Sequence, residues 1–194
     1  MGKRKQELAE VYSDYKSELA YLFGDWGTPF VPGAGKRKDP AGIIVGEAPG
    51  ALEEKHGAPF VGKSGQFLFE TLNAEAALDR CDVWTTNVVK YRPDGNRTPT
   101  DEEIEAATPY LGRELKAVGR NSPPVLLVGT VATKLLGLDQ GVGYWQGQYM
   151  GQYEKTGWVF YITWHPAYVL RRGKDSDAAE QFRKVLRIFG EQQA

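Results

Sequence analysis

The sequence has 194 residues, 41% of them hydrophobic and 25% charged, which predicts one globular domain spanning residues 1–194. The formal net charge is −1, so overall basicity gives no argument for a nucleic-acid or membrane partner. Basic residues nevertheless cluster at 3–5, 36–38 and 171–174, and a binding face needs only local charge.

Cysteine and histidine are too few for most metal sites. Cys81 is the only cysteine, so the chain can form neither an internal disulfide nor a cysteine-ligated zinc site or iron–sulfur cluster. His56 and His165 are the only histidines, and neither lies in a His-Glu-x-x-His pattern. We therefore expect no metal and no cofactor. No run of about 18 apolar residues occurs and no apolar targeting segment is seen, so we expect a cytoplasmic protein without a membrane partner. We also expect a monomer.

Hydrophobic periodicity predicts helices and strands that alternate along the chain. Apolar residues recur at three- and four-residue intervals over residues 5–23, which predicts one amphipathic helix. Short apolar runs predict buried strands at 42–45, 83–86, 125–128 and 159–163. Helices are predicted between and after them: one capped by Ser64, one opened by a Thr100–Glu103 capping box and reaching about Lys116, one at 130–136, and one carrying Phe182 and Phe189. This alternation predicts an α/β fold, a three-layer α/β/α sandwich with a central four-stranded parallel sheet.

Polar residues follow the predicted strands where each one ends. Glu47 follows the first strand, Asn87 the second, Thr130 the third and His165 the fourth. In open parallel sheets, ligands bind beyond the carboxyl ends of the strands. A carboxylate, an amide and an imidazole are therefore expected to meet at one rim, as an acid–base and hydrogen-bonding site, although polar residues also follow strands in proteins without such a site.

Residues 57–64 match a phosphate-binding loop by letter. The segment reads Gly-Ala-Pro-Phe-Val-Gly-Lys-Ser, which satisfies the G-x-x-x-x-G-K-[ST] consensus of ATPases and GTPases. A true phosphate loop follows its strand directly, whereas the polar residues 51–56 come before this one. Pro59 and Phe60 would also fill space that backbone N–H groups need around phosphates. We therefore expect no nucleotide hydrolysis.

Three motifs taken together closely resemble those of the family 4 uracil-DNA glycosylases. They are Gly46-Glu47-Ala48-Pro49-Gly50 with residues 57–62, Thr86-Asn87-Val88-Val89-Lys90 with residues 92–99, and His165-Pro166-Ala167-Tyr168-Val169-Leu170-Arg171. Their order and spacing match the family over about residues 30–190. The resemblance implies a glycosylase-like fold and a monofunctional enzyme that acts on uracil-containing DNA. Such an enzyme hydrolyses the N-glycosidic bond, releases free uracil and leaves an abasic site for base-excision repair.

The resemblance assigns two catalytic residues. His165 matches the family residue that hydrogen-bonds O2 of the departing uracil anion, where negative charge develops. The sequence leaves open whether it acts as neutral imidazole or as imidazolium. Glu47 matches the carboxylate beside the sugar, which stabilises positive charge and orients the attacking water. The alternative holder of that water is the backbone of Glu47 and Ala48.

The resemblance also assigns a base pocket, formed by Gly46, Ala48, Glu53, Phe60 and Asn87. Phe60 matches the aromatic residue that stacks on uracil. Asn87 offers a donor and an acceptor, which suits the N3–H and O4 edge of uracil. Glu53 matches the position that crowds C5 and excludes the methyl group of thymine.

Further residues are expected to contact DNA. Leu170 is expected to fill the gap left by the extruded base, while Arg171 holds a phosphate. More backbone contacts are expected from side chains at the same rim, namely Lys63, Ser64, Lys90, Arg92 and Arg97.

The chain departs from the family pattern at one cofactor. Family members typically carry a [4Fe–4S] cluster on cysteines in the N-terminal segment, directly after the lysine of the second motif, and in the following helix. Here residues 12–23 contain no cysteine, position 91 is tyrosine, and residues 106–110 contain alanine and tyrosine. We expect core packing in place of the cluster.

The alternative function is a non-enzymatic or trapping uracil-DNA binding protein. A related branch of the superfamily forms covalent adducts with DNA, and its signature is a basic insertion containing histidine after the second motif. Residues 87–99 contain neither an insertion nor a histidine, which favours the glycosylase.

Overall fold

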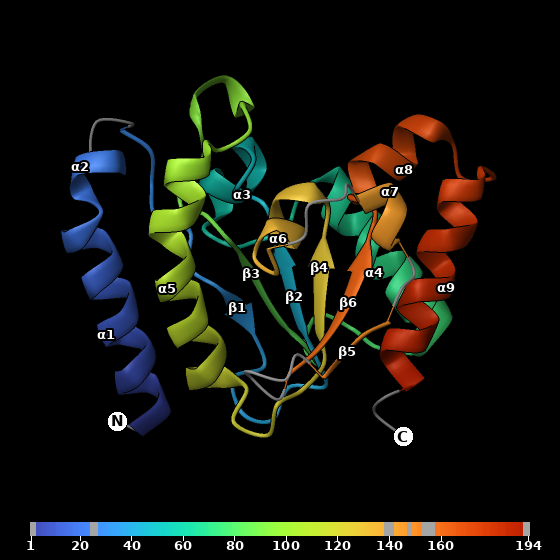
Figure 1. The fold of residues 1–194 in the computed structure, drawn as a ribbon, viewed down its shortest axis with the longest axis horizontal. Helices are drawn as coiled ribbons and strands as arrows, with labels where there is room; N and C mark the ends of the chain where they lie inside the picture. The colour runs from blue at the N-terminus through green and yellow to red at the C-terminus, as the bar shows by residue number, and fades with distance from the viewer. Residues whose placement is uncertain (1–2, 24–26, 138–141, 147–148, 153–157, 192–194) are drawn as a thin grey trace.

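Parallel strands form the centre of the molecule. The computed structural model describes residues 3–23, 27–137, 142–146, 149–152 and 158–191. Its sheet consists of β1 (Ala34–Gly35), β2 (Ile43–Gly46), β3 (Trp84–Asn87), β4 (Val125–Val128), β5 (Tyr149–Gln152) and β6 (Val159–Thr163). The spatial order is β1-β3-β2-β4-β6-β5 (Figure 1). The pairs β3–β2, β2–β4 and β4–β6 are parallel, which confirms the predicted four-stranded parallel core. The edge strands β1 and β5 pair antiparallel and were not predicted.

Helices cover both faces of the sheet. They are α1 (Lys3–Glu18), α2 (Ala20–Phe23), α3 (Ala51–His56), α4 (Lys63–Ala76), the 3-10 helix η2 (Asp94–Asn96), α5 (Asp101–Val118), α6 (Thr130–Lys134), α7 (Val142–Trp145), α8 (Pro166–Arg172) and α9 (Asp177–Glu191). Side chains of α1 and α5 pack on one face, and those of α4 and α9 pack on the other. The three-layer α/β/α sandwich is confirmed.

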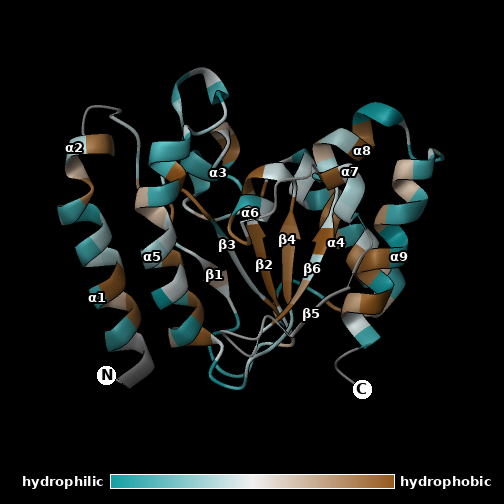
Figure 2. Cartoon of the chain, viewed as in Figure 1, coloured by the Kyte–Doolittle hydropathy of each residue, from teal (hydrophilic) through white to brown (hydrophobic). Residues whose placement is uncertain are grey.

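The central strands are buried on both faces, which explains their continuous apolar runs. In β2, Ile43 and Val45 belong to the core under α1 and α5, whereas Ile44 belongs to the core under α4 and α9. Successive side chains of a strand point to opposite faces, so both cores receive apolar residues from the same run. Figure 2 shows β2, β4 and β6 as the hydrophobic centre of the fold, with mixed hydropathy along the covering helices.

Local signals predicted α5 correctly and α1 and α4 only in part. In the capping box of α5, the Thr100 hydroxyl accepts from the Glu103 N–H at 3.2 Å, and the Glu103 carboxylate accepts from the Thr100 N–H at 2.7 Å. The predicted continuous helix at 5–23 is interrupted at Leu19, between α1 and α2. Ser64 does not cap α4, because the helix begins one residue earlier and Gly62 is its N-cap residue.

The short helix α3 was not predicted, and it occupies the polar segment that precedes the phosphate-loop match. The carboxyl ends of β2, β3, β4 and β6 lie at the same edge of the sheet, the upper edge in Figure 1, where α3, α6 and α8 surround it. The loops at this edge carry the residues of the candidate site.

Candidate active site

The residues that follow the parallel strands line one cavity of about 1060 Å³. Glu47 directly follows β2, Asn87 is the last residue of β3, and His165 lies two residues after β6. The expected meeting of carboxylate, amide and imidazole is therefore confirmed as a matter of position. The same cavity is also lined by other residues that the sequence analysis singled out, namely Ala48, Glu53, Phe60, Ser64, Arg97 and Arg171.

Gly46 lets two of these side chains meet at the cavity wall. A Cβ atom at Gly46 would lie 2.5 Å from Oδ1 of Asn87 and 2.7 Å from Cζ of Phe60. Real Cβ atoms essentially never approach so closely, so any larger residue would displace the amide or the ring. Asn87 and Phe60 are both buried, at 4% and 7% exposure. Glycine at this position therefore keeps an amide edge and an aromatic ring together at the cavity.

Burial and one lysine act in opposite directions on Glu47. Burial of its carboxyl group raises the pKa of Glu47, while the positive charge of Lys134 lowers it. Lys134 lines the cavity from α6 and forms an ion pair with Asp101, with Nζ 2.5 Å from Oδ1. The sequence analysis missed Lys134, although its place one helical turn after Thr130 at a strand end was a usable signal.

His165 is held in one tautomer. It is the N-cap residue of α8, and its Nδ1 accepts a hydrogen bond from the Ala167 N–H at 3.2 Å. A neutral ring that accepts at Nδ1 carries its proton on Nε2, which is then the donor. Burial, together with the positive charge of Arg171, lowers the pKa of His165 to about 4. Both the burial and the contact at Nδ1 favour a neutral imidazole near pH 7.

Glu53 supports the loop that carries Phe60. Its Oε1 accepts from the Gly62 N–H at 2.8 Å, and a Cβ at Gly50 would lie 2.8 Å from its Oε2. The carboxylate thus accepts a hydrogen bond from an N–H at the start of α4. In a true phosphate loop, this N–H would donate to a phosphate. This contact, and the position of the loop after a helix instead of a strand, argue against nucleotide binding at 57–64.

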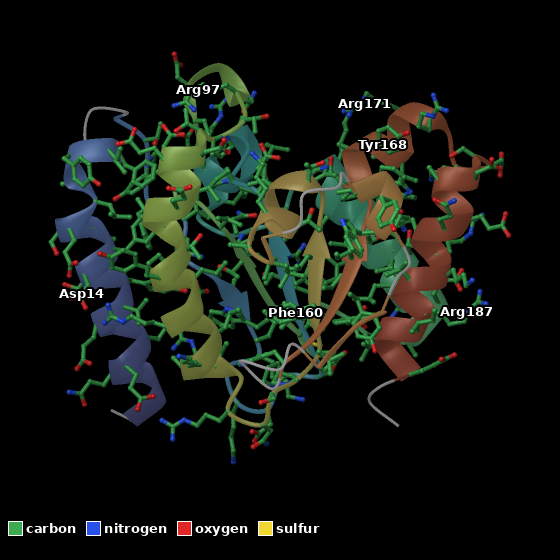
Figure 3. All side chains as sticks on the ribbon, viewed as in Figure 1. Asp14, Arg97, Phe160, Tyr168, Arg171 and Arg187 are labelled. Carbon is green, nitrogen blue, oxygen red and sulfur yellow. The ribbon has the colours of Figure 1, made fainter. Side chains whose placement is uncertain are left out.

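The other residues expected to contact DNA differ in their placement. Lys63, Arg97, Leu170 and Arg171 are exposed, and Ser64 and Arg92 are half-buried. Arg97, on the segment after η2, and Arg171, on α8, both line the cavity, and Figure 3 shows both at the upper edge of the molecule. Arg92 binds Glu54 at 3.1 Å, and Arg97 binds Glu103 at 2.6 Å, so both arginines also brace their loop. Their contacts with DNA remain a prediction.

Lys90 does not lie at the rim, so its predicted DNA contact is wrong. Its side chain is 1% exposed, and its Nζ lies 2.6 Å from Oε2 of Glu114. The same Nζ donates to the Thr86 hydroxyl at 2.5 Å and to the Asn87 carbonyl at 2.6 Å. A lysine at a strand end was expected to face solvent. It is buried because a carboxylate of α5 and two oxygens of the β3 region bind all its donors.

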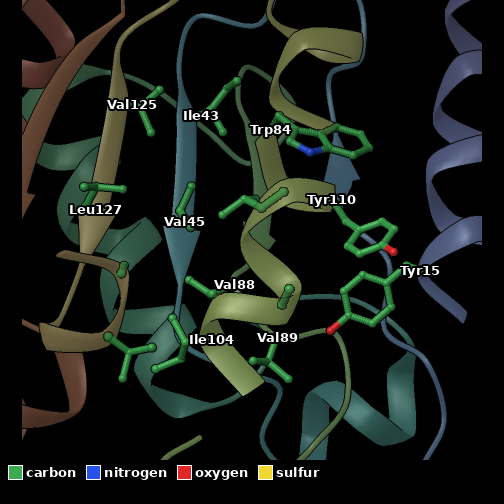
Figure 4. Packing of buried hydrophobic residues seen from close by; sticks show 14 of the residues in the cluster. Tyr15, Ile43, Val45, Trp84, Val88, Val89, Ile104, Tyr110, Val125 and Leu127 are labelled. Carbon is green, nitrogen blue, oxygen red and sulfur yellow. The ribbon is translucent and has the colours of Figure 1, made fainter. Parts of the chain in front are cut away.

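Aromatic rings occupy the positions that correspond to the cluster ligands in the family that this sequence resembles. The ring centroid of Tyr15 lies 5.3 Å from that of Tyr110, 5.5 Å from Phe30 and 5.8 Å from Phe23. The ring of Tyr91 lies 5.4 Å from Phe30 and 5.6 Å from Phe23. Figure 4 shows Tyr15 of α1 beside Tyr110 of α5. Such pairs contribute about 0.5–1.5 kcal/mol each beyond the area they bury.

The residues at these positions do not fit an iron–sulfur cluster. Their rings offer no thiolate ligand, and the single cysteine, Cys81, is exposed and lies outside the aromatic group. Within the described ranges, no group of three or more His, Cys, Asp or Glu side chains is placed to hold a metal ion. The same ranges contain no helix long and apolar enough to cross a membrane.

The fold and the cavity together define a class: an α/β/α protein with a carboxylate, an amide, an aromatic ring and a neutral imidazole at the carboxyl ends of its parallel strands. The family model described as the uracil DNA glycosylase superfamily matches residues 32–189. The chain belongs to this superfamily.

Individual relatives support the same membership. The chain is 43% identical over 167 residues to the Type-4 uracil-DNA glycosylase of Pyrobaculum aerophilum, a match covering 82% of this chain and 81% of that protein. It is 35% identical over 169 residues to the Type-4 uracil-DNA glycosylase of Sulfurisphaera tokodaii, covering 83% and 75%. A shorter match to the enzyme of the same name from Archaeoglobus fulgidus is 49% identical over 94 residues, covering 48% and 46%.

Proposed function

We propose that this protein is a uracil-DNA glycosylase that hydrolyses the N-glycosidic bond of uracil in DNA. The observation that carries the proposal is that Glu47, Phe60, Asn87 and His165 line the same cavity. Membership of the superfamily and the Type-4 relatives support it.

Recognition is proposed to depend on Phe60 and Asn87. Uracil within a duplex is stacked, so the nucleotide must be extruded into the cavity at a cost of a few kcal/mol. Stacking of the base on the ring of Phe60 offsets this cost by about 1–3 kcal/mol. The Asn87 amide then donates to O4 and accepts from N3–H of uracil, whereas cytosine presents the inverse pattern. Close packing against Gly46 restricts the orientation of that amide.

Bond cleavage is proposed to depend on His165. The C1′–N1 bond breaks with its electron pair going to the base, so negative charge develops on O2 of uracil. The Nε2–H of His165 donates to that oxygen and binds the transition state more tightly than the ground state. Because the ring is neutral and its Nδ1 is occupied by the Ala167 N–H, His165 acts as a hydrogen-bond donor and keeps its proton.

The attacking water is proposed to be held by the side chain of Glu47. The carboxylate stabilises the positive charge on the sugar. The water oxygen forms the new bond to C1′ while one of its O–H bonds breaks; the proton passes first to the Glu47 carboxylate and finally to the uracil anion, which leaves as neutral uracil. The backbone carbonyl of Glu47 accepts one hydrogen bond, from the Val89 N–H at 3.1 Å, and the side chain, which carries the negative charge, is proposed as the stronger acceptor for the water.

The finer features of the proposal are a monofunctional enzyme whose products are free uracil and an abasic site for base-excision repair. We propose that residues 1–194 form one monomeric domain that acts in the cytoplasm. The exposed, unpaired Cys81 is usual for a protein of a reducing compartment.

An oligonucleotide assay tests the activity. An end-labelled oligonucleotide with one uracil is incubated with the protein, split into samples with and without alkali, and run on a denaturing gel beside its thymine counterpart. The uracil strand is expected to be cleaved only in the sample that is treated with alkali after incubation with the protein. Cleavage without alkali would contradict the monofunctional proposal, and retarded protein-linked DNA would indicate the trapping alternative. His165→Ala is expected to slow single-turnover excision about 10²-fold while DNA binding changes only several-fold.

A further inference from the structure

Phe60 has a backbone conformation that bulky residues rarely adopt. Its φ is 57°, in the left-handed region, where a non-glycine aromatic residue is strained. Strained conformations persist only where surrounding contacts hold them, and they concentrate at functional sites. The ring of this residue lines the cavity. The contacts that hold its backbone are therefore of functional interest.

Arg80 supplies two of these contacts from a turn that the sequence analysis did not single out. Its Nη1 donates to the Pro59 carbonyl at 2.9 Å, and its Nη2 donates to the Phe60 carbonyl, 20 residues away in the chain. The guanidinium carbon lies 4.1 Å from the ring centroid of Phe69 on α4. Stacking on an aromatic face while donating from both nitrogens is a geometry that only the planar arginine fork provides.

The same loop is also held by one carboxylate acceptor and by close packing. Glu53 accepts from the Gly62 N–H at 2.8 Å, so the loop's carbonyls bind a cation and its N–H binds an anion. A Cβ at Gly65 would overlap the carbonyl oxygen of Phe60, so glycine lets α4 approach the strained residue. Burial lowers the pKa of Arg80, and the charge of Glu53 opposes this shift.

We propose that Arg80 is the positioning residue for the aromatic wall of the base pocket. By binding the Pro59 and Phe60 carbonyls while stacked on Phe69, it maintains the backbone conformation that directs the Phe60 ring into the cavity. This inference rests on the proposed function, because it assigns Arg80 a role in holding the ring that stacks on uracil. It predicts that Arg80 affects excision through Phe60 and through no other group.

A double-mutant cycle separates this role from a general structural one. Single-turnover excision of uracil is measured for the parent, Arg80→Met, Phe60→Ala and the double variant, below the melting temperature of all four. Methionine keeps an apolar stem over Phe69 and removes both hydrogen bonds. Arg80→Met and Phe60→Ala are each expected to slow excision about 10-fold, and the double variant is expected to match Phe60→Ala within about twofold. Losses that multiply to about 100-fold would overturn the proposal.

Two further variants serve as controls. Arg80→Lys keeps the charge but not the fork, and is expected to slow excision about threefold. Arg187→Met removes an arginine that binds Glu75 at 2.5 Å between α9 and α4 and is labelled at the lower right of Figure 3. Neither residue lines the cavity, so this variant is expected to leave the rate unchanged. A rate equal to that of the parent for either Arg80→Met or Arg80→Lys would refute the proposal.

Hydrogen exchange tests the positioning without reference to activity. Amides of residues 57–62 are expected to exchange at least several-fold faster in Arg80→Met than in the parent, with no change in α5 or α9. Unchanged exchange in 57–62, or an equal increase throughout the chain, would overturn the positioning role. If the parent excised no uracil, the proposed function would fail, and the exchange result would still decide whether Arg80 holds the loop.

Discussion

The ammonium nitrogen of Lys90 lies 2.6 Å from Oε2 of Glu114, and both side chains are buried. The lysine also donates to the carbonyl of Asn87 at 2.6 Å. The other carboxylate oxygen of Glu114 accepts from the Tyr12 hydroxyl and from the Trp84 indole N–H, at 2.9 Å each. One charged network thus connects α1, β3 and α5 behind the residue proposed to read the base.

Lys90→Met is expected to destabilise the protein by about 3–5 kcal/mol, because it leaves the charge of Glu114 buried without its partner. Urea unfolding measures the loss. The double variant Lys90→Met with Glu114→Gln is the control and is expected to recover part of it, because the amide oxygen still accepts from Tyr12 and Trp84. The salt dependence of DNA binding should be unchanged by Lys90→Met, whereas a slope reduced by about one would restore a phosphate contact for Lys90.

His165 is expected to titrate far below an ordinary histidine. Its pKa is lowered to about 4 by burial and by Arg171, so the ring should stay neutral, with the proton on Nε2, down to about pH 5. Nitrogen NMR of labelled protein measures both the pKa and the tautomer, and His56→Ala assigns the second histidine. Because the folded state disfavours the charged ring, this group's contribution to stability is present above pH 6.5 and is lost as the pH falls towards 4. Titration of His165 near pH 6.5 would contradict the neutral-donor mechanism.

The rate of excision is expected to fall on acidification with a midpoint above pH 4.5, the ordinary pKa of a glutamate carboxyl group. Burial raises the pKa of Glu47, and the carboxylate must be ionised to hold the water. Single-turnover rates measured against pH give the midpoint. Lys134→Met should move that midpoint to higher pH, since the lysine's charge lowers the pKa of Glu47. Glu47→Gln should be about 10²-fold slower and should lack this acid limb. A midpoint at or below 4.5 in the parent would count against Glu47.

Thymine exclusion is expected to depend on Glu53. A single methyl group changes binding in an apolar pocket by only about 1–3 kcal/mol, so strong rejection requires a wall that the methyl strikes. Glu53→Ala should admit 5-substituted uracils, and 5-fluorouracil should already be excised by the parent because fluorine is small. Glu53→Gln is the matched control, since its amide oxygen can still accept from the Gly62 N–H and keeps the wall. If Glu53→Ala excises uracil but still rejects thymine, the wall lies elsewhere.

The aromatic group around Tyr15 is expected to stabilise the fold without taking part in the chemistry. Tyr15 is fully buried, so Tyr15→Ala should cost about 3–5 kcal/mol of unfolding free energy. Thermal unfolding measures this loss, and excision per folded molecule should be unchanged at low temperature.

Iron and sulfide analysis of anaerobically purified protein should find neither, because one cysteine cannot ligate a cluster. Stoichiometric iron would refute this.

The sequence by itself determined the elements whose causes are local. The runs at 125–128 and 159–163 are strands, as their continuous apolar residues and their short length predict for a strand buried on both faces. The capping box of α5 depends on residues three positions apart, so it can be identified from the sequence. The meeting of Glu47, Asn87 and His165 was also predictable, because the carboxyl ends of parallel strands share one edge of a sheet.

Tertiary structure decided what depends on partners distant in the chain. Lys90 is buried because Glu114 of α5 lies beside β3, and no local pattern distinguishes it from an exposed lysine. Gly62, and not Ser64, is the N-cap residue of α4, and its N–H donates to the carboxylate of Glu53. The carbonyl of Phe60 accepts a hydrogen bond from Arg80, which reaches it from a turn 20 residues later. Side-chain contacts of this kind leave no periodic signal, because their free energy arises only when the packed elements bring the two groups together.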